Sequence, residues 1–168
     1  MKKSTIIYSL VTVIVIIALY FVGGSSTRNG SADTGGQNAD NTSESFASAE
    51  KTFDFGTISM ANGKVSHSFE FENIGSAPVT IGRIYTSCMC TSATLIKSDK
   101  SVGPFGMQGH GFAAGISESL APGEKAKMEV IFDPAAHGPA GIGPIQRVVR
   151  AETNSGYLEF EIKSNVTP

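Results

Sequence analysis

The chain has 168 residues, a formal net charge of −2 and 17% charged residues. That length allows one domain with appendages, and it excludes a large multidomain enzyme. The near-neutral balance argues against a nucleic-acid partner, because phosphate binding requires a concentration of Lys and Arg. Two cysteines are too few for a disulfide-dense scaffold, and 19 glycines predict plentiful loops.

The N-terminus carries a long apolar segment. After the lysines of residues 1–4, residues 5–22 contain no charge. As a helix they would span roughly 27 Å, close to the hydrocarbon thickness of a bilayer. A cleaved signal peptide is the alternative, but its apolar core is normally only about 7–15 residues long. We therefore predict a cytoplasmic N-terminus at 1–4 and an uncleaved transmembrane signal anchor at 5–22.

The charges that flank this segment predict its orientation. Lys2 and Lys3 precede it, and only Arg28 follows soon after it. Positively charged flanks remain in the cytoplasm, so the C-terminal part should lie outside. The predicted location is the cell membrane, with a single pass and an extracytoplasmic C-terminal domain.

Residues 23–50 consist largely of Gly, Ser, Asn, Asp and Thr. Such a segment has little apolar surface to bury, so it cannot offset the entropy lost on ordering. We predict a flexible disordered linker at 23–50 and a folded domain at 51–168.

Apolar and polar residues alternate in the predicted domain with a period of two, which is typical of half-buried strands. The clearest case is 65–72, where Ser or Glu occupies every second position. Further strands are expected at 52–56, 78–85, 125–132, 147–153 and 158–162, with turns at 73–76 and 121–123. About seven short strands and no helical period after residue 22 predict an all-β protein, an antiparallel β-sandwich.

Five motifs occur in order along this region. They are FDFGTI at 53–58, FEFENIG at 69–75, SCMCT at 87–91, APGE at 121–124 and VIFDP at 130–134. As a set they resemble a bacterial family of extracytoplasmic domains of unknown function whose hallmark is a Ser-Cys-Gly-Cys-Thr motif. That family is similar to the ASH, MSP and PapD-type sandwiches. The resemblance, over about residues 52–166, implies an immunoglobulin-like fold and an extracytoplasmic location, and it implies no activity.

The chain departs from the family pattern in two ways. Met89 stands where the family has Gly between the cysteines. Residues 98–118 and 135–144 look like Gly-rich insertions, and they carry His110 and His137. The chain has therefore gained potential metal ligands in addition to its two thiols.

Cys88 and Cys90 are the first candidates for chemistry. On an extended strand their Cα atoms would lie about 6.5–7 Å apart on one face. That spacing is at or beyond the limit for a disulfide, which would require a tight local turn. Two thiolates on one face can instead bind Cu(I) or Zn(II), and unprotected thiols outside the cytoplasm tend to oxidise. A metal site is favoured, and a disulfide or redox-active pair and inert packing remain as alternatives.

Two ligand sets follow. A Cu(I) site would use Cys88, Cys90, Met107 and His110, because a thioether is a soft ligand. A closed structural Zn(II) site would use Cys88, Cys90, His110 and His137. Spacing alone does not choose between them, and Met107 can equally pack as an apolar plug in its loop.

The remaining histidine, His67, keeps phase with the apolar positions of its strand, so we expect it to face the core with a bonded ring nitrogen. Met89 would point away from both cysteines on a regular strand, which makes it a poor third ligand.

No motif in the chain predicts an enzyme. The phosphate-binding loop, the HExxH pair and the Gly-x-Ser-x-Gly elbow are all missing from the sequence. Thiol–disulfide exchange is the least implausible enzymatic role, but a Cys-x-Cys pair lacks the helix N-terminus that activates a catalytic thiol. We predict a membrane-anchored binding domain that holds Cu(I) or Zn(II). The alternative is an interaction or structural module of the cell envelope, with an unidentified protein partner and no metal.

Overall fold

The computed structural model describes residues 44–98, 100–110 and 115–168. The predicted N-terminus at 1–4, the anchor at 5–22 and most of the predicted linker lie outside these residues. Within the described ranges, no helix has the length and apolar character needed to cross a membrane.

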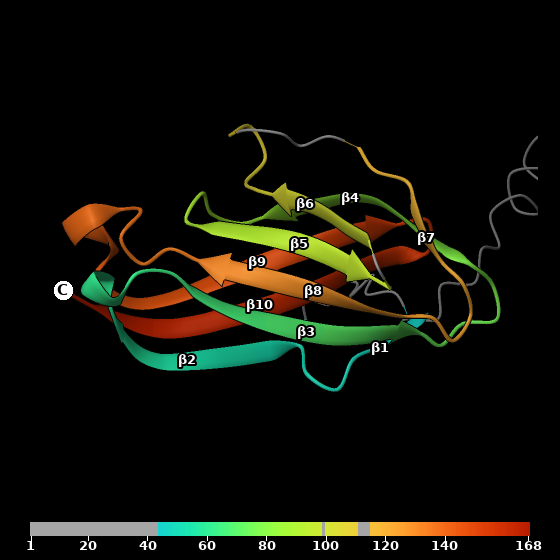
Figure 1. Ribbon diagram of the computed structural model, residues 1–168, viewed down its shortest axis with the longest axis horizontal. Coiled ribbons are helices and arrows are strands. Elements are labelled where there is room, and N and C mark those ends of the chain that lie inside the picture. The colour runs from blue at the N-terminus through green and yellow to red at the C-terminus, as the bar shows by residue number, and fades with distance from the viewer. Residues whose placement is uncertain (1–43, 99, 111–114) are drawn as a thin grey trace, which may run out of the picture. The chain divides into compact units, whose positions relative to one another are not determined.

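The described residues form an all-β sandwich of two five-stranded sheets (Figure 1). The first sheet has the order β1 (Phe46–Ala47), β3 (Val65–Asn73), β8 (Lys125–Phe132), β5 (Thr91–Lys97) and β6 (Lys100–Phe105). The second has the order β2 (Thr52–Ser59), β10 (Gly156–Thr167), β9 (Gly143–Thr153), β4 (Val79–Thr86) and β7 (Glu118–Leu120). Two short 3-10 helices, η1 (Met60–Asn62) and η2 (Gly138–Gly141), lie in connections.

The all-β class is confirmed, and two details of the prediction are corrected. The described residues contain ten strands and not about seven, partly because β1 and β7 have only two and three residues. Such short strands show no period in the sequence. The sheets are also not purely antiparallel, since β2 pairs in parallel with β10, with Phe53 opposite Ile162.

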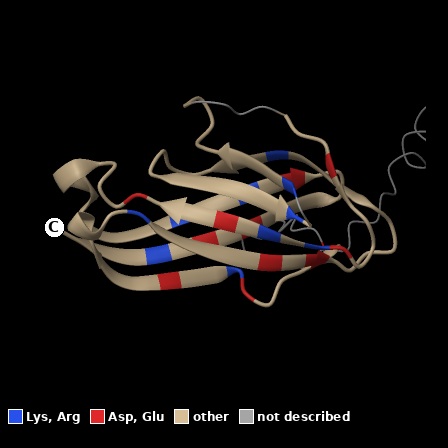
Figure 2. Ribbon diagram, viewed as in Figure 1, with Lys and Arg blue, Asp and Glu red and all other residues tan. Residues whose placement is uncertain are grey.

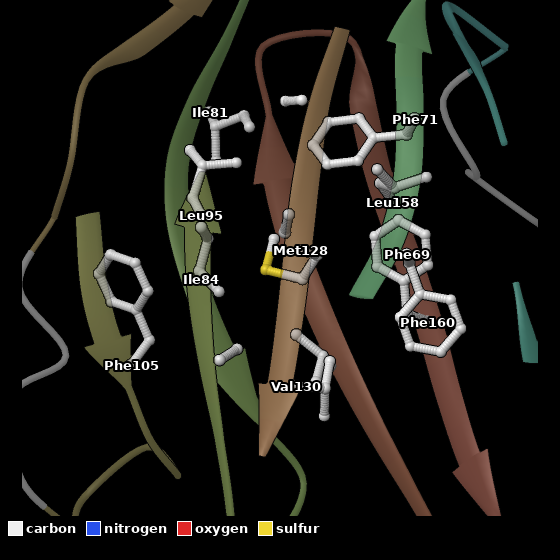
Figure 3. Close-up of a cluster of buried hydrophobic side chains, with 14 of the residues drawn as sticks. Phe69, Phe71, Ile81, Ile84, Leu95, Phe105, Met128, Val130, Leu158 and Phe160 are labelled. Atoms are coloured by element: carbon white, nitrogen blue, oxygen red, sulfur yellow. The ribbon is translucent and has the colours of Figure 1, made fainter. Parts of the chain in front are cut away.

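The core lies between the two sheets, where alternate side chains of the long strands such as β8 and β10 point inward. Phe69 of β3 stacks on Phe160 of β10 with ring centroids 4.7 Å apart, so the two aromatic rings join the sheets (Figure 3). Met128 and Val130 of β8 are fully buried beside them. Burying a side chain of this size contributes roughly 1.5–3 kcal/mol. The inward side chains that alternate along the sequence therefore hold the two sheets face to face.

The outward positions of the first sheet carry paired charges. Figure 2 shows residues of both signs along β3 and β8. Glu70 lies 2.8 Å from Lys127, and Glu72 lies 3.8 Å from Lys125. The hydrogen bond and the charge of Lys127 lower the pKa of Glu70. Opposite charges that face one another across neighbouring strands favour the observed register.

The folded region begins before residue 51. Phe46 of β1, at the end of the segment predicted as a linker, is only 6% exposed. Its ring packs edge-on against Phe71, with centroids 5.6 Å apart. A single aromatic residue among polar neighbours gives no periodic signal, so the predicted boundary at residue 51 falls after β1.

His67 has the expected bonded ring nitrogen. Its Nε2 lies 2.8 Å from Glu50 Oε2, and its ring stacks on Phe53 at 3.7 Å. The ring is half-buried and lies at the border of the core. These contacts give His67 a structural role.

The connections gather at two ends of the sandwich. One end, here called the cysteine end, holds the β4–β5 turn (87–90), the β8–β9 loop (133–142) and η1, and it also holds the C-terminus (Figure 1). The opposite end, here called the asparagine end, holds the β3–β4 connection (74–78) and the β7–β8 turn (121–124). Strand pairing fixes this arrangement, because Phe132 lies opposite both Val65 and Thr91.

Candidate metal centre

The two cysteines lie in a turn and not on an extended strand. The N–H of Thr91 donates to the Cys88 carbonyl at 3.1 Å. The buried Thr86 hydroxyl lies 2.9 Å from that carbonyl and 3.0 Å from the carbonyl of Thr91. The turn brings the Cα atoms of Cys88 and Cys90 to 5.3 Å, and the two sulfurs form a disulfide. The expected strand geometry is therefore wrong, and the tight local turn that a disulfide requires is present.

The two sulfurs differ in exposure. Cys90 is 3% exposed, whereas Cys88 is only partly buried. The carbonyl of Cys90 accepts a hydrogen bond from Asp133 N at 2.8 Å, which ties the turn to the β8–β9 loop. Ser87 N donates to the carbonyl of Val148 at 2.9 Å, which ties the turn to β9. The pair is thus held between β9 and the loop after β8.

His137 approaches the pair from the β8–β9 loop. Its Nε2 lies 3.1 Å from Cys88 Sγ. A disulfide sulfur carries no proton, so the imidazole N–H is the donor in this contact. The loop owes its shape to local bonds: Ala135 N donates to Asp133 Oδ1 at 3.0 Å, and Gly138 adopts a φ of 54° that favours glycine. His137 itself is exposed.

Cys88, Cys90 and His137 form a group that can hold one metal ion. Their ligand atoms all lie within 4.8 Å of one another, and no other cluster of three or more His, Cys, Asp or Glu of this kind occurs among the described residues. A tetrahedral ion with bonds of about 2.0–2.3 Å to N and S places its ligand atoms roughly 3.5–3.8 Å apart. The two sulfurs are bonded to each other here, so the group can hold an ion at that spacing only when the pair is reduced.

The Gly-rich insertion is fastened beside the turn. Thr86 N donates to the carbonyl of Gly106 at 3.1 Å, and Met107 forms a parallel bridge with Thr86. Met107 is therefore held beside Thr86, two residues before Cys88, and is partly buried. His110 is exposed and does not belong to the three-residue group. The structure places His137, and not His110, against the cysteines.

Arg147 contacts the cysteine pair, and the sequence alone does not predict this contact. It lies on β9, and its Nε donates to Cys90 Sγ at 3.3 Å. The two residues are 57 positions apart, so only the pairing of β4 with β9 brings them together. Arg147 lies inside β9, and no pattern in the sequence distinguishes it from other strand residues.

Met60 is a second residue that the sequence does not reveal. A Cβ atom added at Gly141 would lie 3.2 Å from His137 Cβ and 3.4 Å from Met60 Cε. The thioether of η1 therefore lies next to the loop that carries His137.

Residues 46–106 match the family described as "Protein of unknown function (DUF1573)". The matched part includes both cysteines and ends before His137 and Arg147. No curated protein matches the chain.

Several solved structures are similar to the chain. A protein of unknown function from Porphyromonas gingivalis W83 is 13% identical, with a TM-score of 0.53 over 80% of this chain and 52% of that one. This chain therefore spans about half the length of that protein. The ASH/PapD-like domain 7 of human CEP192 is 17% identical, with a TM-score of 0.43 over 82% and 94% of the two chains. The CooA pilin subunit of enterotoxigenic Escherichia coli is 10% identical, with a TM-score of 0.42 over 73% and 97%.

The likeness to the Porphyromonas gingivalis protein supports the sandwich fold alone, because the identity is only 13%. Residues 46–106 thus carry the signature of the DUF1573 family of unknown function, which confirms the resemblance drawn from the sequence motifs, and the described domain is a β-sandwich of two five-stranded sheets.

Proposed function

We propose that this protein is a membrane-anchored, extracytoplasmic binding module that holds one Cu(I) ion when its cysteine pair is reduced. Cys88 and Cys90 would bind the ion as thiolates, with His137 as the third ligand. The observation that carries this proposal is the approach of all three ligand atoms to within 4.8 Å. The apolar segment 5–22 and the lysines before it support the anchor and its orientation.

The composition of the site favours Cu(I) over Zn(II). Structural zinc almost always takes four ligands, and among the described residues no fourth His, Cys, Asp or Glu joins the group. Thiolates and thioethers select Cu(I), and Met60 packs beside the His137 loop. Two thiolates and one Cu(I) carry a net negative charge, which the Arg147 guanidinium beside Cys90 offsets.

The test is an anaerobic titration of the reduced full-length protein in detergent with Cu(I), in competition with a chromophoric Cu(I) chelator, and in parallel with Zn(II). We expect one Cu(I) per chain, and no bound Cu(I) after the double change Cys88→Ser/Cys90→Ser. His137→Ala should weaken binding by roughly tenfold or more, since it removes a ligand. His110→Ala is the matched control and should leave affinity unchanged. Failure of the reduced protein to bind Cu(I) overturns the proposal. Tighter binding of Zn(II) than of Cu(I) would identify zinc as the ion of this site and overturn the assignment of Cu(I).

A protein-interaction module of the cell envelope is the second candidate. Two large apolar side chains are exposed at the cysteine end, Met89 at 58% and Ile142 at 47%. Exposed apolar groups of this kind are used in contacts between proteins. Capture of the same envelope partner by wild type and by Cys88→Ser/Cys90→Ser would favour this candidate over metal binding.

A further inference from the structure

We propose that the Cys88–Cys90 bond is an exchangeable disulfide, opened by an external dithiol that attacks Cys88 and expels Cys90. Opening the bond creates the two thiolates that hold the ion, so this exchange would control the metal site. That consequence rests on the proposed function, whereas the exchange itself does not. The proposal stands on the different surroundings of the two sulfurs.

Access favours attack at Cys88. Its side chain is partly exposed, and the next residue, Met89, is 58% exposed. Cys90 is 3% exposed, so an external thiolate cannot reach it without opening the domain. Exchange depends on which sulfur an attacking thiolate can reach, and here that sulfur is Cys88 Sγ.

The surroundings of Cys90 suit a leaving group. The guanidinium of Arg147, which is always charged, donates from Nε to Cys90 Sγ at 3.3 Å. A neighbouring cation stabilises a thiolate, and a stabilised thiolate leaves faster. The sequence lacks a helix N-terminus at the cysteine motif, and Arg147 supplies the missing positive charge from β9.

The exchange balances in two steps. In the first, one thiolate of the dithiol bonds to Cys88 Sγ, the Cys88–Cys90 bond breaks, and Cys90 Sγ keeps the electron pair beside Arg147. In the second step, the remaining thiolate of the dithiol attacks the dithiol sulfur that is bonded to Cys88. The bond to Cys88 breaks, and Cys88 leaves as a thiolate. The dithiol becomes a disulfide, the cysteine pair gains two electrons, and protons are exchanged with solvent.

The first experiment locates the attacked sulfur in wild-type, full-length protein. The oxidised protein is incubated with glutathione in a buffer that contains a metal chelator, and the reaction is quenched with iodoacetamide. Mass spectrometry then shows which cysteine carries glutathione and which is alkylated. We expect glutathione on Cys88 and the alkyl group on Cys90. The opposite labelling, or opening of the bond only after the chain is unfolded, overturns the proposal.

The second experiment tests the positioning role of Arg147. The rate of reduction by dithiothreitol at fixed pH should fall about tenfold in Arg147→Met, because the hydrogen bond to the leaving thiolate is lost. Arg147→Lys keeps the charge and should show an intermediate rate, which preserves the test if the Met variant folds poorly. Arg83→Met removes an exposed Arg that pairs with Glu152, and it should match wild type. Equal rates for wild type, Arg147→Met and Arg147→Lys overturn the role of Arg147.

Both experiments are run in the presence of a metal chelator, so their outcome is independent of metal binding. Exchange at Cys88 without Cu(I) binding by the reduced protein would leave this inference standing and remove the proposed function. Cu(I) binding by a chemically reduced protein whose disulfide resists native exchange would do the reverse.

Discussion

The two ends of the sandwich use polar side chains to fix their turns, but they leave different atoms accessible. At the asparagine end, Asn73 is fully buried, and its Nδ2 donates to the carbonyls of Ala77 at 3.0 Å and Leu120 at 2.9 Å. Its Oδ1 accepts from Gly75 N at 3.0 Å. All of these partners are backbone atoms, so the Asn73 side chain holds the two connections together and has a structural role.

At the cysteine end, Thr86 has the same role as Asn73. Its buried hydroxyl forms hydrogen bonds to the backbone of the cysteine turn. The turn then presents two sulfurs to His137 and Arg147, and one of the sulfurs is partly exposed. Similar turn-fixing bonds can therefore support either a turn whose partners are all backbone atoms or a turn that carries two cysteines. What differs is whether a reactive atom lies beside the fixed turn.

The largest expected loss of stability comes from a change at the asparagine end. Asn73→Ala removes three side-chain hydrogen bonds and leaves buried backbone groups unpaired, which should cost about 3 kcal/mol of unfolding free energy. Urea unfolding measures the loss, and exposed Asn62→Ala is the control. Cu(I) affinity per folded molecule should not change. A large drop in that affinity would show that the two ends are coupled.

The matching change at the cysteine end is Thr86→Val, which keeps the shape of the side chain. Loss of the hydroxyl bonds should cost about 1–2 kcal/mol of unfolding free energy. Unlike Asn73→Ala, this change should also lower Cu(I) affinity several-fold, because the spacing of the two sulfurs depends on the turn. Unchanged affinity in the chelator competition would contradict that dependence.

A subtler change disturbs only the histidine loop. The Cβ of Gly141→Ala would lie 3.2 Å from His137 Cβ, so the loop must shift by a few tenths of an ångström. We expect a loss of about 1 kcal/mol in unfolding free energy and a Cu(I) affinity reduced by a smaller factor than in His137→Ala. Gly63→Ala, at the other side of η1, adds a Cβ that meets no atom within 4 Å but is strained by a φ of 80°. That control should lose stability without losing affinity.

The smallest effect concerns the pH dependence of the asparagine end. A hydrogen bond from Ala121 N, assisted by Lys97, lowers the pKa of Glu124 from its ordinary value of 4.5. A lowered folded-state pKa stabilises the fold above pH 4.5, and this contribution is lost as the pH falls through the lowered value. Glu124→Gln should therefore cost about 0.5 kcal/mol at pH 7 and nothing in strong acid. A difference between the two proteins that is the same at both pH values would contradict this assignment.

The long strands were predictable because their inward residues repeat every two positions. The predicted strand at 125–132 coincides with β8, and the one at 78–85 is one residue from β4. The chain also contains strands without that signal. β6 lies within the Gly-rich insertion, where Gly and Pro interrupt any alternation.

The candidate site was predictable in its residue types and less so in its geometry. Cys88, Cys90 and His137 belong to the predicted ligands, because thiols and imidazoles are recognisable by their chemistry. Their arrangement depends on hydrogen bonds of the Thr86 hydroxyl within the turn, and on the approach of His137, which is 49 residues from Cys88 in the sequence. Arg147 could not be predicted, since its role exists only through a contact across 57 residues.

The parallel pairing of β2 with β10 has a mechanical consequence. The chain enters β2 from the asparagine end, and β10 ends at the cysteine end. After the two-residue β1 has peeled away, a pull on the N-terminal side of β2 and on the C-terminus would act along the two strands in opposite directions. Their backbone hydrogen bonds would then bear the load together in shear, and not one after another as in an unzipping hairpin. A domain held in this way resists being pulled apart by the two ends of these strands more strongly than its equilibrium stability alone would suggest.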